Sequence, residues 1–253
     1  MRKAAMIVLI ISLALAAETM ASAQASDDVA GRMRRIVEEI KAASYPELAD
    51  LKNAEIEIKL FDSPSDYFQT RFTFTSFLFK KKLRCLLRVN RNLFAHGVPD
   101  DGLRAILAHE LSHVVYFKTR NRLALLGLVR LACKSFTARF ERGTDLEAIQ
   151  RGYGNGLKSY RLWLYGHIPA NKLEEKKRNY FSPAELDALQ LRLRAQPELM
   201  KQWRRHPPRS LLEIEPAATL PATNYEPRDG SPVQTSALVT ARSSLTHPRR
   251  NRW

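Results

Sequence analysis

An apolar helical segment with two histidines and a glutamate constrains this chain more than any other feature. His109, Glu110 and His113 follow the pattern His-Glu-x-x-His, and the flanking residues from Leu103 to Phe117 are mostly apolar. Residues four apart lie on the same face of an α-helix, so the two imidazoles can be directed at one point. Polar side chains on a buried helix are costly without a partner, and a Zn²⁺ ion about 2.0–2.1 Å from both imidazoles provides one. The segment therefore predicts a metal site.

Glu110 lies between the two histidines in the sequence but not on their face of the helix. It is rotated by roughly 100° from His109, because an α-helix has about 3.6 residues per turn. A carboxylate in this place can flank a metal ion without binding it and can act as a general base toward water. The alternative is a surface helix with two incidental histidines, and the apolar residues on both sides of the motif argue against it.

A third ligand is expected, because a catalytic zinc site takes three protein ligands and keeps one position open. The best candidates lie on a predicted second helix, where Glu141 and Asp145 are four residues apart and share a face. Glu141 can bind the metal while Asp145 accepts the second N–H group of a ligating histidine and fixes its tautomer. A solvated helix with charge pairs four residues apart is the alternative. The other histidines are less well placed: His96, His167, His206 and His247.

The two segments together resemble a known signature. His-Glu-x-x-His followed by Glu-x-x-x-Asp on a later helix is similar to the pattern of gluzincin metallopeptidases, and Phe140 to Ala148 resemble the glutamate helix of the CAAX-processing-type peptidases. The small soluble gluzincins are the nearer analogy, because the sequence shows none of the multiple membrane spans of the CAAX-processing enzymes. Gly143-Thr144-Asp145 is also similar to a motif of the aspzincins, in which an aspartate is a ligand, so Asp145 is the alternative third ligand.

The resemblance implies a zinc-dependent peptidase that hydrolyses peptide bonds in a peptide or protein substrate. The implied roles are zinc ligands for His109, His113 and Glu141, a general base for Glu110, and an orienting contact for Asp145. Hydrolysis also needs a hydrogen-bond donor for the developing oxyanion. Tyr160 and His167 are the first candidates because they follow the third ligand in the chain, ahead of Tyr116 and Tyr153.

Three strand-like runs precede the histidine helix. Residues 55–60 alternate apolar and polar side chains, residues 72–75 alternate again, and a third run begins at Leu83 and ends near Asn90. These runs predict a small antiparallel sheet, with the third strand at its edge, where an extended peptide can add as a further strand. Helices follow, one of them starting at Ser182-Pro183. We therefore predict an α+β fold with a single zincin-like domain over residues 24–212.

The two ends of the chain are predicted to lie outside this domain. A basic start is followed by the apolar run Ala4–Ala17 and by small residues at 21–23, so residues 1–23 are expected to be a secretory signal removed on export. An uncleaved membrane anchor is the alternative, but the run is shorter than the roughly 20 residues of a span. Export places the protein in the periplasm or outside the cell. Residues 213–253 are rich in Pro, Ser, Thr and Arg and predict a disordered basic tail.

The chain carries a formal net charge of +15. This charge favours contact with anionic envelope polymers, a membrane surface or acidic substrates, although solvated basic faces explain it equally well. No nucleic-acid recognition motif is found, so a nucleic-acid partner is not expected. A basic, apolar segment over residues 121–134 is predicted to be a core helix, with a membrane-surface or acyl-substrate contact as the alternative.

Two other functions fit the same sequence. One is a non-catalytic, cationic envelope-binding protein with a metalloprotease-like fold, and the intact Glu110 argues against it. The other is a membrane-associated processing protease, which would depend on the segment of residues 121–134. Cys85 and Cys133 can form a disulfide in an oxidising compartment, and two buried free thiols are the alternative.

Overall fold

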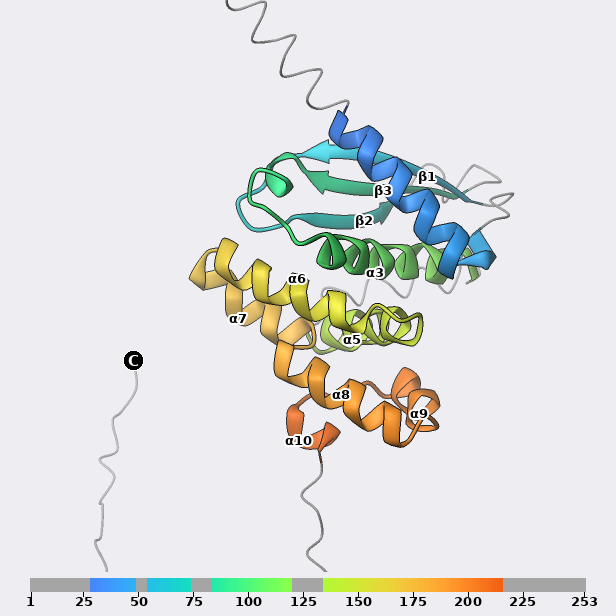
Figure 1. Ribbon diagram of the computed structural model, residues 1–253, viewed down its shortest axis with the longest axis vertical. Coiled ribbons are helices and arrows are strands. Elements are labelled where there is room, and N and C mark those ends of the chain that lie inside the picture. Colours follow the sequence, from blue (N-terminus) through green and yellow to red (C-terminus); the bar gives the residue numbers. More distant parts are fainter. Residues whose placement is uncertain (1–27, 49–53, 74–82, 120–133, 216–253) are drawn as a thin grey trace, which may run out of the picture. The chain divides into compact units, whose positions relative to one another are not determined.

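The structure is a computed structural model, and it describes residues 28–48, 54–73, 83–119 and 134–215. These residues form helices and one three-stranded sheet, so the predicted α+β class is confirmed. Figure 1 shows the sheet on one side of the long helix α3 (Asp100–Thr119) and the later helices on the other side. None of the described helices combines the length and the apolar character that a membrane span requires.

The sheet is mixed, which corrects the prediction of an antiparallel sheet. β1 (Ala54–Phe61) and β3 (Leu83–Asn90) are parallel, whereas β2 (Phe68–Phe72) pairs antiparallel with β3. The strand order β1-β3-β2 also puts β3 in the centre and not at the edge. Alternation along a strand reports which face is buried, and it carries no information on strand direction or order. The buried side chains of the central strand include Cys85, Leu87 and Val89.

α3 contacts both the sheet and the helices that follow it in the chain. Acidic residues occupy its first turn, where negative charge favours a helix N-terminus. Two glycines allow its close crossing with α6 (Gly154–His167). A Cβ atom built on Gly156 would lie 2.7 Å from the Ala105 Cβ, and one on Gly102 would lie 3.0 Å from the Tyr160 nitrogen. This crossing brings Tyr160 next to the histidine helix.

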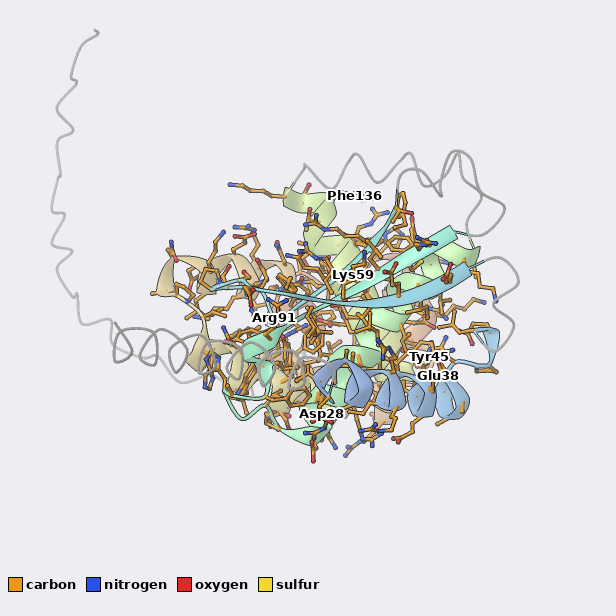
Figure 2. The ribbon with its side chains drawn as sticks, turned by 90° about the horizontal axis from the view of Figure 1, so that it is seen from above. Asp28, Glu38, Tyr45, Lys59, Arg91 and Phe136 are labelled. Carbon is orange, nitrogen blue, oxygen red and sulfur yellow. The ribbon has the colours of Figure 1, made fainter. Side chains whose placement is uncertain are left out.

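The helix of residues 28–44 packs beside α3, and the residue that follows it contacts α3 at the His-Glu-x-x-His motif. Arg32 forms an ion pair with Asp100 over 3.0 Å. At the other end, the Tyr45 hydroxyl donates a hydrogen bond to the Ala108 carbonyl oxygen, 2.6 Å away. Figure 2 shows Tyr45 where this helix ends. Because Ala108 is the residue before the histidine motif, this contact fixes the backbone of α3 at the motif itself.

The remaining helices follow one another with short connections. α8 (Pro183–Ala195) begins as its sequence predicts: the Ser182 hydroxyl accepts from the Glu185 backbone N–H, and the Glu185 carboxylate accepts from the Ser182 N–H. The other helices are α5 (Lys134–Gln150), α7 (Ala170–Asn179), α9 (Leu199–Arg205), α10 (Leu211–Ile214) and the short η1 (Pro46–Leu48) and η2 (Arg91–Leu93).

Several sequence predictions lie outside the described residues. These are the signal at residues 1–23, residues 121–133 of the basic segment with Cys133, and the tail from residue 216 onward. Residues 74–75 of the second strand-like run are also outside them, and Phe72 is the last residue of β2. Cys85 is a buried free thiol, and burial raises its pKa to about 12. Ile214 of α10, which the sequence assigned to the tail, is fully buried.

Candidate metal centre

Three side chains from two helices meet at one point inside the protein. His109 and His113 come from α3, and Glu141 comes from α5. The Glu141 Oε2 lies 3.2 Å from the His109 Nε2 and 3.3 Å from the His113 Nε2. The three candidate ligand atoms all lie within 4.8 Å of one another, so this group is close enough to bind a metal ion. Glu141 is the most exposed of the three, at 15% of its side chain, which marks the direction of solvent.

Both imidazoles are held from behind by α5. The His109 Nδ1 lies 2.7 Å from the Asp145 Oδ1, and with its proton on Nδ1 the ring directs an Nε2 lone pair at the cluster. The His113 Nδ1 lies 3.4 Å from the Thr144 Oγ1, whose own proton goes to the Phe140 carbonyl oxygen. Two consecutive residues of one helix therefore orient the two histidines of the other.

Asp145 is fully buried and is itself held by two further groups. The Arg161 Nη2 donates to its Oδ1 over 3.0 Å, and the Phe181 backbone N–H donates to its Oδ2 over 3.2 Å. Burial opposes the ionised form, but the charges of Arg161 and His109 lower the pKa of the Asp145 carboxyl. Since both oxygens of Asp145 face these partners, the geometry favours the orienting role over the alternative role of a ligand.

The charges at this centre are strongly coupled. Burial lowers the pKa of His109, but Asp145 and Glu141 outweigh burial and raise that pKa to about 10. Burial likewise disfavours an ionised Glu141, but the two histidines hold the pKa of its carboxyl well below the usual range. These shifts favour a protonated His109 beside an ionised Glu141 at neutral pH when no ion is bound. A divalent ion would displace that proton, as metal binding to histidine generally does.

Glu110 lies beside this cluster in a nearly closed environment. Glu110 is only 6% exposed, and its Oε2 has no hydrogen-bond partner among the described residues. It lines a small cavity of about 20 Å³, enough for roughly one water molecule. The other residues that line this cavity are Ser65, Tyr67, Phe68, Ile106, Tyr160, Arg161, Leu164, Lys176 and Tyr180.

The two predicted oxyanion donors lie in different places. Tyr160 is buried and lines the cavity beside Glu110, and burial raises the pKa of its hydroxyl far above the ordinary value. His167 lies at the end of α6, where its ring stacks on Trp163 at 4.8 Å and on His96 at 5.5 Å between ring centroids. The structure therefore brings Tyr160, and not His167, to the cavity beside Glu110.

The sequence analysis missed Tyr180 as a candidate for this site. It lies between α7 and α8, lines the cavity beside Glu110, and has its ring centroid 5.8 Å from that of His109. The Arg161 guanidinium lies over its ring at 4.5 Å. Burial raises the pKa of Tyr180 well above the ordinary value, and the neighbouring carboxylates add to this. In the sequence, Tyr180 is marked only by its place two residues before Ser182, the N-cap of α8. That place does not show which residues α8 packs against, so it does not identify Tyr180 as part of the site.

Comparison of this chain with protein-family models, with curated proteins and with solved structures finds no match.

Proposed function

We propose that this protein is an exported, zinc-dependent metallopeptidase of the gluzincin type. The observation that supports this best is the convergence of the His109 Nε2, the His113 Nε2 and the Glu141 Oε2 within 4.8 Å of one another. Two imidazoles and one carboxylate are the ligand set of an established group of catalytic zinc sites. Imidazole nitrogens favour zinc over Mg²⁺ and Ca²⁺, which prefer oxygen ligands. Export is proposed from the sequence of residues 1–23.

The other polar groups of the site fit a bound ion. The Nδ1 atoms of both histidines are engaged by Asp145 and Thr144, so the Nε2 atoms remain for the ion. The unpartnered Oε2 of Glu110 would be costly in a site that only stabilised the fold, because buried polar atoms normally have a hydrogen-bond partner. A water molecule in the adjoining cavity would supply that partner.

The roles of the surrounding side chains follow from this arrangement. A zinc ion held by the cluster would act as a Lewis acid toward the scissile carbonyl group and the attacking water. Glu110 accepts the proton of that water and delivers it to the leaving amine. Burial raises the pKa of Tyr160 and Tyr180 and keeps both hydroxyls protonated, so either can donate a hydrogen bond to the developing oxyanion. Tyr180 is the stronger candidate, because its ring also contacts His109.

An extended peptide has a strand to pair with beside this cavity. β2 is an edge strand of the sheet that the described residues form, and its first residue, Phe68, lines the cavity. Main-chain hydrogen bonds along such an edge hold a peptide in a defined direction. β2 therefore replaces β3, which is central, as the proposed strand for substrate binding.

The cavity must open before a peptide can enter, because about 20 Å³ is far smaller than a peptide segment. One side of the cavity is the connection that leads into β2, and the other side is α7 with Tyr180. An ion pair of 2.8 Å between the Asp66 carboxylate and the Lys176 Nζ joins the two sides. Separation of this pair would expose Glu110 next to the edge of β2.

Metal analysis and a peptide-cleavage assay on the full chain test the proposal. We expect about one zinc per chain, and we expect Glu110→Gln to keep the metal but to lose hydrolysis of a broad peptide library. Glu39→Gln, which removes an exposed glutamate that pairs with Arg104, is the matched control and should change neither quantity. Hydrolysis that survives Glu110→Gln would refute the general-base role. A zinc-loaded wild type that cleaves no peptide would favour the non-catalytic envelope-binding alternative.

The ligand assignment has its own test. Zinc should be lost from His113→Ala and from Glu141→Ala, whereas Asp145→Ala should weaken zinc binding by about 10–100-fold, as expected for a group that only orients a ligand. Zinc content after dialysis against a competing chelator measures the difference. If Glu141→Ala keeps its zinc and Asp145→Ala loses it, Asp145 is the third ligand.

A further inference from the structure

A second, larger cavity lies between α3, α5 and α9, and the proposed reaction does not use it. Its volume is about 360 Å³, within the range of small-molecule sites in proteins. Tyr116, Phe136 and Phe140 form its apolar wall, with ring centroids 5.1 Å apart for Tyr116 and Phe140 and 6.3 Å apart for Phe136 and Phe140. Figure 2 shows Phe136 on the first turns of α5, at the opposite side of the view from Tyr45. The cavity is therefore large enough to hold an apolar chain or ring against this wall.

The rim of this cavity is positively charged. Arg139 and Arg205 line it, are exposed, and have no ion-pair partner in the described ranges. Arg204 also lines it but is already paired with Glu147 over 2.8 Å. Guanidinium groups bind carboxylates and phosphates with two parallel hydrogen bonds, so two free arginines at an aromatic cavity favour an anionic group.

The aromatic wall separates this cavity from the metal cluster. The Phe140 ring stacks on His113 with centroids 5.1 Å apart, and the Thr144 hydroxyl lies at the His113 Nδ1. Phe140 and Thr144 both line the larger cavity, so this cavity lies behind His113, on the side away from the His113 Nε2. A molecule bound there would not reach the cluster, and its binding does not depend on the proposed hydrolysis.

We propose that this cavity binds an amphiphilic anion. The apolar part of the molecule packs against Tyr116, Phe136 and Phe140, and its carboxylate or phosphate pairs with Arg139 and Arg205. A free fatty acid and an anionic lipid headgroup with its acyl chain both have this chemistry. The proposal goes beyond the peptidase function and stands on different residues.

Calorimetric titration of the full chain with decanoate and decyl phosphate tests the proposal. We expect one binding site, and the double variant Arg139→Gln/Arg205→Gln should bind decanoate about tenfold more weakly or worse. Lys201→Gln/Arg194→Gln removes the same charge from neighbouring exposed positions that do not line this cavity, and it should leave the dissociation constant unchanged. Decyltrimethylammonium, with the same chain and the opposite charge, should bind much more weakly.

A second variant blocks the cavity without removing charge. Gly143 lines it, and among the described residues a Cβ atom built there meets only the Pro207 Cγ at 3.8 Å. Gly143→Leu would therefore project into the cavity, and Gly143→Ala is a size control. Decanoate binding should be lost in Gly143→Leu and kept in Gly143→Ala, with circular dichroism to show that both are folded. Binding should persist with a chelator present, which separates this result from failure of the peptidase proposal.

Vesicles distinguish the two sources of the anion. Co-sedimentation with phosphatidylglycerol vesicles that is lost in Gly143→Leu assigns the site to a lipid, and binding of decanoate without vesicle binding assigns it to a free molecule. Both results support the anion site. Equal decanoate affinity in the wild type, in the double arginine variant and in Gly143→Leu would overturn it, and so would equal affinity for decanoate and decyltrimethylammonium.

Discussion

Replacing Arg161 by methionine would remove the buried cation that holds Asp145 behind the cluster of His109, His113 and Glu141. The side chains of Arg161 and Asp145 are 2% and 0% exposed, and their closest atoms are 3.0 Å apart. Methionine keeps the length of the side chain, but within the described part of the chain it leaves a buried carboxylate with only the His109 ring and the Phe181 N–H as partners. Breaking a buried ion pair by removing one partner costs about 3–5 kcal/mol. We expect Arg161→Met to lose unfolding free energy in this range.

Urea unfolding at pH 7 with a chelator present measures this loss apart from metal binding. The matched control is Arg32→Met, because Arg32 and Asp100 form a pair of the same length, 3.0 Å, that is 45% and 80% exposed. Exposed pairs contribute about 0–1 kcal/mol, so this control should shift the urea midpoint only slightly. The double variant Arg161→Met/Asp145→Asn removes the stranded charge as well and should recover part of the stability that Arg161→Met loses.

The same substitution should also affect the proposed metal site. Asp145 orients His109, and loss of a group that supports a metal ligand typically costs 10–100-fold in affinity. Arg161→Met should therefore bind zinc more weakly at equal protein folding, while Arg161→Lys should keep part of the affinity. If Arg161→Met loses no more stability than Arg32→Met and binds zinc as the wild type does, the buried network behind His109 does not exist as described.

Three further predictions concern protonation, the oxyanion and the closed cavity. Because the pKa of His109 is raised to about 10, the contribution of His109 to the stability of the metal-free protein should be fully present below pH ~6.5 and be lost as the pH rises through about 10. Zinc binding at pH 7.5 should release about one proton, seen by calorimetry in two buffers. Tyr180→Phe should lower kcat by about 10²–10³-fold if its hydroxyl holds the oxyanion, with a smaller effect for Tyr160→Phe, both from steady-state kinetics with zinc content unchanged. Lys176→Met, which breaks the half-buried pair with Asp66, should raise kcat/KM for a peptide by about fivefold, and an unchanged or lower value would show that this pair does not limit access.

The part of the site within single helices could be predicted from the sequence. His109 and His113, and likewise Glu141 and Asp145, are four residues apart, and helical geometry alone puts each pair on one face. The expectation that Asp145 contacts a histidine ring agrees with the 2.7 Å contact to His109. That the two faces meet, however, depends on the packing of α3 against α5, which spacing along the chain does not determine.

Residues from other elements could not be predicted in this way. Tyr160 and His167 are seven residues apart, so they share a face of α6, but they are separated by about 10 Å along its axis. The crossing of α3 and α6, in which Gly102 packs against Tyr160 and Gly156 against Ala105, determines which of the two lies at α3. Tyr180 has no motif of its own, and its position depends on where α7 ends and α8 begins. The direction of the strands is a similar case, because alternation in β1 and β3 is the same for parallel and antiparallel pairing.

The two sides of the site differ in how firmly they are held, and this difference suggests where the molecule opens. On the side of the candidate ligands, one turn of α5 provides Glu141, Thr144 and Asp145. The adjacent Arg142 is buried in an ion pair with Glu185. It also donates hydrogen bonds to three carbonyl oxygens, those of Lys177, Arg178 and Pro208. Such a network resists movement, because each buried donor would lose its partner. On the side of β2, by contrast, the ion pair that crosses the cavity joins Asp66 and Lys176, and both side chains are partly exposed. We therefore expect a substrate of the proposed peptidase to enter by moving the connection before β2 away from α7, while the candidate ligands and their supporting residues stay in place.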